Sequence, residues 1–570
     1  DYRNSIQTIV IGDQITQIGR YAFPWTACST IQFGKSVRSI GAEAFSGCRN
    51  LNGDLTIPDS VQTIGDSAFE TCTGLTGTLT LGNGLQTIGF NAFYDCPFSG
   101  DLVIPDSVTS IGIQAFYCWT YYLPETQGTL TLGKNLRTIG AFAFCESRYT
   151  GSLTIPDSVV EIGERAFRDC KNLNGTLTLG KNLRTIGEEA FCWCEFTGSL
   201  TIPEGVTEIA DGAFSSFSGD NSFTGKLTLP STLKTIGASA FSYTDFSGEL
   251  LIPDGVTSIG ANAFKECDGF GGLLSLPDSV KTVGEWAFYL CKGFTGLKLS
   301  AGLTKIEKLS FAHMYGLRTE VVIPEGVTEI GESAFSCSYM PSVRLPSTLK
   351  KIEKQAFMYA HNLTKITLPD GLETIGDEAF SGCHPRNAVV LPASIKSIGK
   401  KAFDRDGAIY GNLNEIPVGV YFLGDAPQIV GTGNANCSFP SDWTLFYLPG
   451  TSGWTSDTYE GYQIAPWDGE TRWDNPHTRR FGRDINGNQI ETSWSVNPDT
   501  GKITLTDDLN EGCVVAVSYD AEGRVTGIGV LRTKTDFVIL NLQDTCRLFL
   551  LNASSSPRLD APVTINYYIP

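Results

Sequence analysis

One short signature, Ile-Gly-x-x-Ala-Phe, recurs along most of this chain and constrains its fold more than any other feature. Its phenylalanine occurs seventeen times, and most copies lie 22 to 24 residues apart. A fixed period of this length indicates a solenoid, in which each repeat forms one coil and contacts only its neighbours. A stacked array also removes the size limit of a single core, which a chain of 570 residues would exceed. The signature residues are Phe23, Phe45, Phe69, Phe93, Phe116, Phe144, Phe167, Phe191, Phe214, Phe241, Phe264, Phe288, Phe311, Phe335, Phe357, Phe380 and Phe403.

Each coil begins with a short strand. In a typical coil, Leu55 and Ile57 alternate with Thr56, which is the period of a strand with one buried face. Pro58 lacks an N–H group and therefore ends the pairing of that strand. Because every coil repeats the same path, these strands are expected to stack into a parallel sheet.

The second half of the coil supplies the rest of the core. Val61 and Ile64 turn a second apolar face inward, and Gly65 gives the backbone freedom at a corner. Ala68 and Phe69 begin a short helical or irregular return, and the phenylalanine ring fills the core. No coil buries these side chains alone, so stacking must bury them continuously.

The coils are of two alternating kinds, so the unit of duplication is a pair of coils of about 47 residues. One kind carries Ile-Pro-Asp-Ser or Ile-Pro-Glu-Gly, and the other carries Leu-Gly or Leu-Pro. The acids that follow the strand proline are interpreted as turn formers. They are Asp59, Asp106, Asp157 and Asp254.

The repeat resembles the BspA-like family of bacterial leucine-rich repeats, whose members carry Leu-x-x-Ile-x-Ile-Pro-x-x-Val-x-x-Ile-Gly-x-x-Ala-Phe-x-x-Cys. The match covers about 400 residues and departs from the pattern at Ala210, Glu307, Ser310 and Glu353. The resemblance implies a β-rich solenoid of the α/β type, a leucine-rich-repeat array of about 17 coils with a parallel sheet. It also implies an extracellular or cell-surface protein, commonly an adhesin or host-interaction factor.

Sixteen cysteines raise the question of disulfides or metal sites. Eight of them lie three residues after the signature phenylalanine, where a small apolar side chain packs well in the core. We therefore expect buried free thiols. With four histidines and no paired Cys-x-x-Cys knuckles, neither zinc nor another cofactor is expected. The eight are Cys48, Cys72, Cys96, Cys170, Cys194, Cys267, Cys291 and Cys383.

Two insertions break the period, and insertions in a solenoid form loops on one face that often carry binding. The first contributes Trp119, Tyr121 and Tyr122, and the second contributes Phe217. Aromatic side chains of this kind anchor sugar rings or partner proteins. The alternative is a tolerated loop whose aromatic residues cover the neighbouring coil.

Hydroxyl residues recur in the strands, on the face that points away from the core, and predict a polar binding face. A regular threonine array also matches ice, but leucine-rich sheets curve and the columns decay after Thr228. Threonine is in any case a good strand residue. The candidate binding residues are Thr80, Thr131, Thr154, Thr178 and Thr201.

The chain changes character after the array. We place the leucine-rich-repeat solenoid at 1–415, a C-terminal cap module at 416–467 and a β-sandwich-like domain at 468–570. A cap is needed because the open end of a solenoid is an apolar, unpaired sheet edge. Short strands separated by turn signals predict the β-sandwich, and its sequence resembles C-terminal modules of gut Firmicutes surface proteins.

Four residues of this C-terminal region have individual interpretations. Trp454 and Trp467 are interpreted as core residues of the cap. Cys513 and Cys546 fall outside the repeat phase, so they are the candidate disulfide pair.

Charge and the distribution of polar residues narrow the function. The net charge of −19 repels phosphate backbones and anionic lipid, so nucleic acid is not an expected partner. No run of 18 apolar residues occurs, so no insertion of this chain into a membrane is expected. Nearly every polar residue recurs with the repeat, whereas catalysis needs a unique convergent site, so an enzyme is not expected. The chain begins at Asp1 rather than methionine, which suggests a mature or truncated chain.

Together these features predict a monomeric, extracellular or cell-surface binding protein. We expect it to recognise a host or matrix protein, or a glycan, through the solenoid face and the insertion loops. The competing hypothesis is a structural spacer of the cell envelope that presents the C-terminal domain.

Overall fold

The computed structural model describes most of the array, the region that follows it, and the backbone of nine strands between residues 480 and 566. The described ranges before those strands are 5–118, 127–217, 222–364, 366–383, 389–404, 419–432, 436–441, 443–454 and 457–466. The chain divides into two compact units. The first comprises 1–363, 371–383 and 399–406, and the second comprises 364–370, 384–398 and 407–570.

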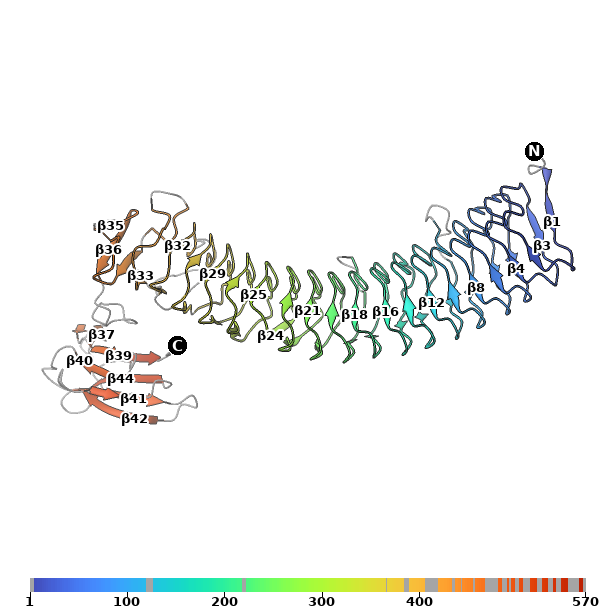
Figure 1. The fold of residues 1–570 in the computed structure, drawn as a ribbon. Helices are drawn as coiled ribbons and strands as arrows, with labels where there is room; N and C mark the ends of the chain where they lie inside the picture. Colours follow the sequence, from blue (N-terminus) through green and yellow to red (C-terminus); the bar gives the residue numbers. More distant parts are fainter. Residues whose placement is uncertain are drawn as a thin grey trace. The chain divides into compact units, whose positions relative to one another are not determined.

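The first unit is a curved stack of coils, drawn from blue to yellow in Figure 1. A regular coil has two very short strands, such as β5 (Leu55–Thr56) and β6 (Thr63–Ile64), followed by a return made of turns. These strands pair in parallel, so Thr63 lies beside Thr87 and Ile64 beside Ile88. The register shifts at one place, between Gly272 and Leu273. The predicted solenoid is confirmed. Within the described residues the return contains no α-helix, so the irregular alternative was the right one.

The second strands of the coils form long parallel ladders. The first is an eight-stranded sheet of β2 (Gln17–Ile18), β4 (Ser39–Ile40), β6, β8 (Thr87–Ile88), β10 (Ser110–Ile111), β12 (Thr138–Ile139), β14 (Glu161–Ile162) and β16 (Thr185–Ile186). It is followed by β18 (Glu208–Ile209), β20 (Thr235–Ile236), β21 (Ser258–Ile259) and β23 (Thr282–Val283), and then by β25 (Lys305–Ile306), β27 (Glu329–Ile330), β29 (Lys351–Ile352) and β30 (Thr374–Ile375). Each isoleucine or valine of these strands is buried.

The first strands pair in shorter groups. The two-stranded pairs are β1 (Thr8–Val10) with β3 (Thr30–Gln32), β5 with β7 (Leu79–Thr80), β9 (Leu102–Val103) with β11 (Leu130–Thr131), β13 (Leu153–Thr154) with β15 (Leu177–Thr178), and β17 (Leu200–Thr201) with β19 (Leu227–Thr228). A four-stranded group contains β22 (Gly272–Ser275), β24 (Phe294–Lys298), β26 (Val321–Val322) and β28 (Val343–Arg344). In the two-residue strands the first side chain is buried and the second is exposed, as the alternation of Leu55 and Thr56 predicts.

The return forms a third hydrogen-bonded ladder, and left-handed residues make it possible. Ser67 and Thr71, two residues before and two after Phe69, have φ of 53° and 55°. The amides of Ser67, Phe69 and Thr71 donate to carbonyls of the next coil at 2.6, 2.8 and 2.7 Å. A non-glycine residue in this region costs about 1–2 kcal/mol, and the inter-coil hydrogen bonds offset that cost. Most described coils repeat both left-handed positions.

The corner glycine has a different role from the one predicted. Gly65 has no positive φ, so conformational freedom is not what selects it. A Cβ atom at this position would lie 2.7 Å from the amide nitrogen of Ala42 in the preceding coil. Close approach of two backbones therefore selects glycine at this corner.

The signature phenylalanines form one continuous column from Phe23 to Phe403. Successive rings are stacked, with centroids 5.1 to 5.7 Å apart. Phe167, for example, is fully buried between Phe144 and Phe191, at 5.3 Å from each ring. This column is the centre of the core of the first unit.

The phased cysteines are buried free thiols, as predicted. Their position has a further cause, because each thiol donates to the carbonyl of the phenylalanine in the preceding coil. Cys72 Sγ, for example, lies 3.2 Å from the carbonyl oxygen of Phe45. Ser338 fills the same position in a later coil and donates to the Phe311 carbonyl at 2.9 Å. A small side chain with a donor is therefore what the position requires.

Contacts between neighbouring coils select the glycine of the Leu-Gly coils. A Cβ atom on Gly82 would lie 2.3 Å from the carbonyl oxygen of Pro58 in the preceding coil. Asp59 Oδ1 accepts the amide of Asn83 in the next coil at 2.7 Å. These acids lie in turns, as predicted, and Asp59, Asp106 and Asp157 also bridge to the next coil.

The second unit begins with a five-stranded sheet. Its order is β31 (Val389–Leu391), β33 (Gly419–Phe422), β34 (Thr444–Tyr447), β36 (Tyr462–Pro466) and β35 (Thr458–Tyr459). The first three pairings are parallel and the last is antiparallel. The unit also contains β32 (Ser397–Ile398). Trp454 is 9 % exposed and stacks on Tyr447 at 5.4 Å, whereas Trp467 and both predicted domain boundaries lie outside the described residues.

The remaining strands are antiparallel. A four-stranded sheet has the order β42 (Val525–Leu531), β41 (Cys513–Tyr519), β44 (Thr545–Leu551) and β45 (Val563–Asn566). A three-stranded sheet has the order β39 (Trp494–Asn497), β40 (Lys502–Leu505) and β43 (Phe537–Ile539). The strands β37 (Arg480–Arg483) and β38 (Gln489–Glu491) form a pair. The register places Cys546 opposite Ser518, five residues along the strand from Cys513. That separation is about 16 Å at the rise of a strand, which is too far for the candidate disulfide between these cysteines.

Candidate functional site

The predicted threonine face is present as an exposed column on the first strands. Thr80, Thr131, Thr154, Thr178 and Thr201 are each the exposed second residue of a strand. Thr154 lies beside Thr178, and Thr201 lies beside Thr228. Val103, which is 56 % exposed, lies beside Thr131 and interrupts the hydroxyl column. The column is therefore less regular than an array of identical threonines.

The insertion residues lie elsewhere on the coil. Trp119, Tyr121 and Tyr122 lie outside the described residues. Phe217 is 40 % exposed and stacks on Trp193, with ring centroids 4.5 Å apart. Trp193 follows a signature phenylalanine and belongs to the return, so Phe217 and the threonine column are on different segments of the coil. The structure does not bring the two sets of predicted residues together.

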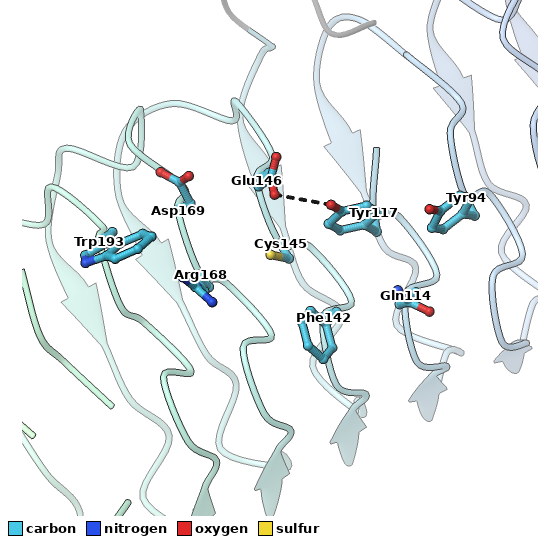
Figure 2. Close-up of a pocket in the computed structure, with 9 residues that line it drawn as sticks. All are labelled: Tyr94, Gln114, Tyr117, Phe142, Cys145, Glu146, Arg168, Asp169 and Trp193. Carbon is cyan, nitrogen blue, oxygen red and sulfur yellow. Dashed lines mark hydrogen bonds between the residues drawn. The ribbon is translucent and has the colours of Figure 1, made fainter. Parts of the chain in front are cut away.

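The return side carries an open cavity of about 350 Å³, shown in Figure 2. Five consecutive coils line it, from the coil of Phe93 to the coil of Phe191. Its aromatic walls are Tyr94, Tyr117, Phe142 and Trp193. Its polar lining consists of Gln114, Cys145, Glu146, Arg168 and Asp169. A volume of this size lies within the range of small-ligand sites, about 300–1,000 Å³.

Cys145 lines the cavity at a position where one other of the five coils also carries a small residue, Cys192. The position after the signature phenylalanine holds Tyr94, Tyr117 and Arg168 in three of these coils. In the coil between Tyr117 and Arg168 the same position holds Cys145, which is 4 % exposed. The row of large side chains is interrupted there.

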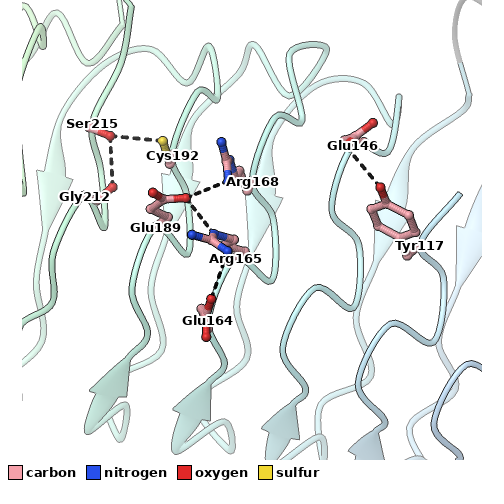
Figure 3. Close-up of polar contacts among 9 residues, drawn as sticks. All are labelled: Tyr117, Glu146, Glu164, Arg165, Arg168, Glu189, Cys192, Gly212 and Ser215. Atoms are coloured by element: carbon pink, nitrogen blue, oxygen red, sulfur yellow. Dashed lines mark hydrogen bonds and ion pairs between the residues drawn. The ribbon is translucent and has the colours of Figure 1, made fainter. Parts of the chain in front are cut away.

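Polar contacts fix the side chains around the cavity, as Figure 3 shows. Tyr117 Oη donates to Glu146 Oε1 at 3.2 Å, and burial together with the Glu146 charge raises the pKa of the tyrosine. Arg165 and Arg168 share Oε2 of Glu189, at 2.7 and 2.9 Å. Each partner is half-buried, so these contacts are screened less than those of fully exposed pairs. The Arg168 guanidinium is thereby held in place over the ring of Trp193.

Stacking covers both faces of Trp193. The guanidinium carbon of Arg168, from the preceding coil, lies 4.3 Å from the ring centroid. Phe217, from the following coil, stacks on the same ring at 4.5 Å. At the other end of the cavity Tyr94 stacks on Tyr117, with centroids 5.4 Å apart. Sugar recognition by stacking needs an open ring face, and neither face of Trp193 is open.

The titratable residues of the cavity are a buried thiol and two carboxylates. The thiol of Cys145 is buried, which raises its pKa, so a thiolate nucleophile is disfavoured. Glu146 and Asp169 are hydrogen-bond acceptors at the rim, and Asp169 also pairs with Lys171 at 3.1 Å. In the part of the chain that the structure describes, no three histidine, cysteine or acidic residues are grouped to hold a metal.

Sequence reasoning identified only Phe217 among these residues and missed Tyr94, Phe142, Arg168 and Trp193. A signal was available in the position after the signature phenylalanine. It holds Tyr94, Tyr117, Cys145 and Arg168 in successive coils, whereas the core positions around it hardly vary. Variation at one phase of a regular repeat marks the surface that the scaffold leaves free.

The fold and the repeat define a bacterial type of leucine-rich solenoid, and comparison with known proteins identifies its family. The BspA type leucine rich repeat region matches this chain in six copies, over residues 2–122, 50–145, 120–244, 215–338 and 272–385. The chain therefore belongs to the family of BspA type leucine-rich repeat proteins. A search of curated proteins finds no match.

Solved structures with related folds include three leucine-rich repeat proteins from bacteria. A leucine-rich repeat protein from Bacteroides ovatus is 26 % identical, with a TM-score of 0.48, over 68 % of this chain and 88 % of that chain. One from Eubacterium ventriosum is 20 % identical, with a TM-score of 0.37, over 64 % of this chain and 94 % of that chain. A leucine rich cell surface protein from Faecalibacterium prausnitzii is 23 % identical, with a TM-score of 0.27, over 66 % and 85 %. Among the residues described here, no helix could cross a membrane.

Proposed function

We propose that this chain is an extracellular or cell-surface interaction protein that binds a partner protein through the return side of its array. The observation that carries the proposal is the cavity at Cys145, where five coils of an otherwise regular stack leave an aromatic and charged hollow of about 350 Å³. The family and the cell-surface relative from Faecalibacterium prausnitzii support an exposed location.

A protein partner fits this lining better than a glycan. A glycan needs open aromatic faces and several free polar groups that read its hydroxyls. Here Trp193 is covered on both faces, Arg168 is engaged by Glu189, and the Tyr117 hydroxyl is engaged by Glu146. Aromatic residues and arginine grouped in a hollow are instead typical of the energetic centre of a protein–protein interface.

The test is a binding screen of the full chain against extracellular matrix proteins and a glycan array, followed by variants of each candidate face. Trp193→Ala removes a wall of the cavity, and Thr131→Arg and Thr178→Arg place bulk and charge on the threonine column. We expect protein hits that weaken at least tenfold in Trp193→Ala and remain within twofold in both threonine variants. Hits lost in the threonine variants alone would place binding on the strand face. A screen without hits would favour the spacer hypothesis over the proposal.

A further inference from the structure

The first coil differs from the others in the place of its cysteine. The phased position, three residues after the signature phenylalanine, holds Thr26 in this coil, and Cys28 follows two residues later. In the second coil the phased position holds Cys48. Both thiols are fully buried, and both are free in the structure. The departure from the repeat therefore places two thiols in the core where the first two coils meet.

One hydroxyl group contacts both thiols. Thr26 Oγ1 lies 3.2 Å from Cys28 Sγ and 3.1 Å from Cys48 Sγ, so the two sulfur atoms are at most about 6.3 Å apart. A hydrogen bond between the two thiols lowers the pKa of Cys48 and raises that of Cys28. Cys48 is therefore the more nucleophilic of the two at neutral pH, because the thiolate is the reactive form.

Oxidation of this pair leaves the nearest buried carbonyl with a side-chain donor. Cys48 Sγ lies 3.1 Å from the carbonyl oxygen of Phe23 and donates to it. Thr26 Oγ1 donates to the same oxygen at 3.2 Å. When Cys48 loses its proton, the threonine hydroxyl keeps this carbonyl hydrogen-bonded. The cost of an unsatisfied buried acceptor is thereby avoided.

A phased pair in the middle of the array offers a comparison. Cys267 and Cys291 lie in neighbouring coils and are as deeply buried, and Cys291 Sγ donates to the Phe264 carbonyl at 3.0 Å. Loss of that thiol proton would leave the carbonyl with the amide of Cys267, at 3.3 Å. Coils also stack on both sides of this pair. A disulfide is therefore disfavoured here, although the two cysteines share one phase of the repeat.

The position of the first pair gives a bond between its members a function. Among the residues that the structure describes, the first coil packs against one neighbour. Ile15 is 45 % exposed, whereas Val37, at the same position of the second coil, is fully buried. An end coil of this kind opens more readily than an interior coil. A bond between residues 28 and 48 would restrict that opening.

We propose that Cys28 and Cys48 are oxidised to a disulfide that fastens the first coil to the second. The oxidant is a small disulfide such as oxidised glutathione, which an oxidising extracellular environment supplies. The Cys48 thiolate attacks one sulfur of the oxidant and releases one small thiol, and the Cys28 sulfur then attacks the mixed disulfide and releases the other. The protein loses two protons and two electrons, and the oxidant is reduced to two thiols. The inference takes only the extracellular location from the proposed function.

The test is peptide mapping of the full chain after equilibration with reduced and oxidised glutathione. Trypsin places each of the four cysteines in its own peptide, namely Cys28 in 21–35, Cys48 in 39–49, Cys267 in 266–281 and Cys291 in 282–292. Without reductant, we expect the first two peptides to be linked in at least half of the chains and the last two in fewer than one chain in twenty. Unlinked Cys28 and Cys48, or equal linkage of the two pairs, would overturn the inference.

Hydrogen exchange tests whether the bond fastens the coil. The amides of Tyr21, Phe23 and Trp25 donate to carbonyls of the second coil. They should exchange at least tenfold more slowly in the oxidised chain than in the same chain after reduction, because they exchange when the first coil opens. The amide of Phe167, in the middle of the array, should change less than twofold. Unchanged exchange of the first coil in a linked chain would overturn the fastening role.

Cys28→Ser removes one thiol and keeps a small polar side chain, so it should abolish the linkage and the slow exchange together. Reduction of the wild-type chain gives the same comparison, so the test stands even where the variant does not fold. Linkage in a chain that shows no protein hit in the binding screen would support this inference while the proposed function fails. Protein hits on a chain in which Cys28 and Cys48 stay unlinked would do the reverse.

Discussion

Removal of one ring from the phenylalanine column tests how the array is held together. Phe167 is fully buried and stacks on Phe144 and Phe191, each at 5.3 Å with interplanar angles of 8° and 1°. Phe167→Ala leaves a cavity in the centre of the core and removes two stacked contacts. Substitutions of this kind cost about 3–5 kcal/mol, and the upper half of that range applies because neighbouring coils cannot collapse into the gap without breaking three hydrogen-bonded ladders.

Phe23→Ala is the matched control. Phe23 belongs to the first coil and is half-buried, and among the residues that the structure describes it stacks only on Phe45, at 5.6 Å. Its loss removes one stacked contact and less buried area, so we expect about half the cost of Phe167→Ala. Urea denaturation of the full chain, followed by circular dichroism at several protein concentrations, measures both. A cost for Phe23→Ala equal to or above that of Phe167→Ala would refute the argument that stacking between coils is the main source of stability.

Three further predictions concern the contacts between coils. Gly41→Ala should lower the melting temperature, measured by calorimetry, more than Gly19→Ala does. A Cβ atom on Gly41 would lie 2.7 Å from the amide nitrogen of Arg20, whereas nothing lies within 4 Å of a Cβ atom on Gly19. Equal effects of the two substitutions would show that the close approach does not matter. In urea denaturation, Cys72→Ser should lower the free energy of unfolding less than Cys72→Ala, by about 1 kcal/mol. Serine can still donate a hydrogen bond to the Phe45 carbonyl, as Ser338 does to the Phe311 carbonyl. The reverse order would contradict the role of this hydrogen bond. The carboxyl pKa values of Asp54 and Asp101 lie below the usual range because Thr78 and Thr129 donate backbone and hydroxyl hydrogen bonds to them. This stabilisation is present above about pH 4, the usual range for an aspartate, and is lost as the pH falls through the lower folded-state values. The melting temperature should therefore fall below that pH, and less steeply in Asp54→Asn with Asp101→Asn; identical acid slopes would exclude these two residues as a cause.

The sequence predicts the path of each coil well because the core requirements repeat. Leu55, Ile64 and Phe69 are buried as their periodicity indicates, and Cys72 lies in the core for the reason that its phase suggested. Seventeen copies of one pattern average out the local ambiguities that make short strands hard to assign in a single copy. The repetition therefore made the fold predictable from the sequence.

The left-handed residues of the return could not be predicted. Ser67 and Thr71 carry no local preference for positive φ, and they adopt it because the next coil offers a carbonyl to each turned amide. The role of Gly65 was misjudged for the same reason, since the clash that selects glycine is with Ala42 of another coil. Contacts between coils, rather than preferences within one, decide these positions.

The candidate site was predicted only at its edge. Phe217, from the second insertion, lies on the same side of the coil as the cavity, where Cys145 lies between Tyr117 and Arg168 in successive coils. A small residue is not conspicuous in a sequence. It becomes so only when the register of neighbouring coils aligns it with two large side chains.

Hydroxyl-radical footprinting of the full chain with a protein hit from the binding screen tests the central claim most directly. Tyrosine, tryptophan and phenylalanine oxidise readily, so the aromatic residues of the cavity report on the return side. Val103 and Leu251, which are 56 % and 63 % exposed, report on the strand side. We predict that the partner protects Tyr94, Phe142 and Trp193 and leaves Val103 and Leu251 unchanged. Protection of Val103 and Leu251 with no change at Trp193 would contradict binding through the return side.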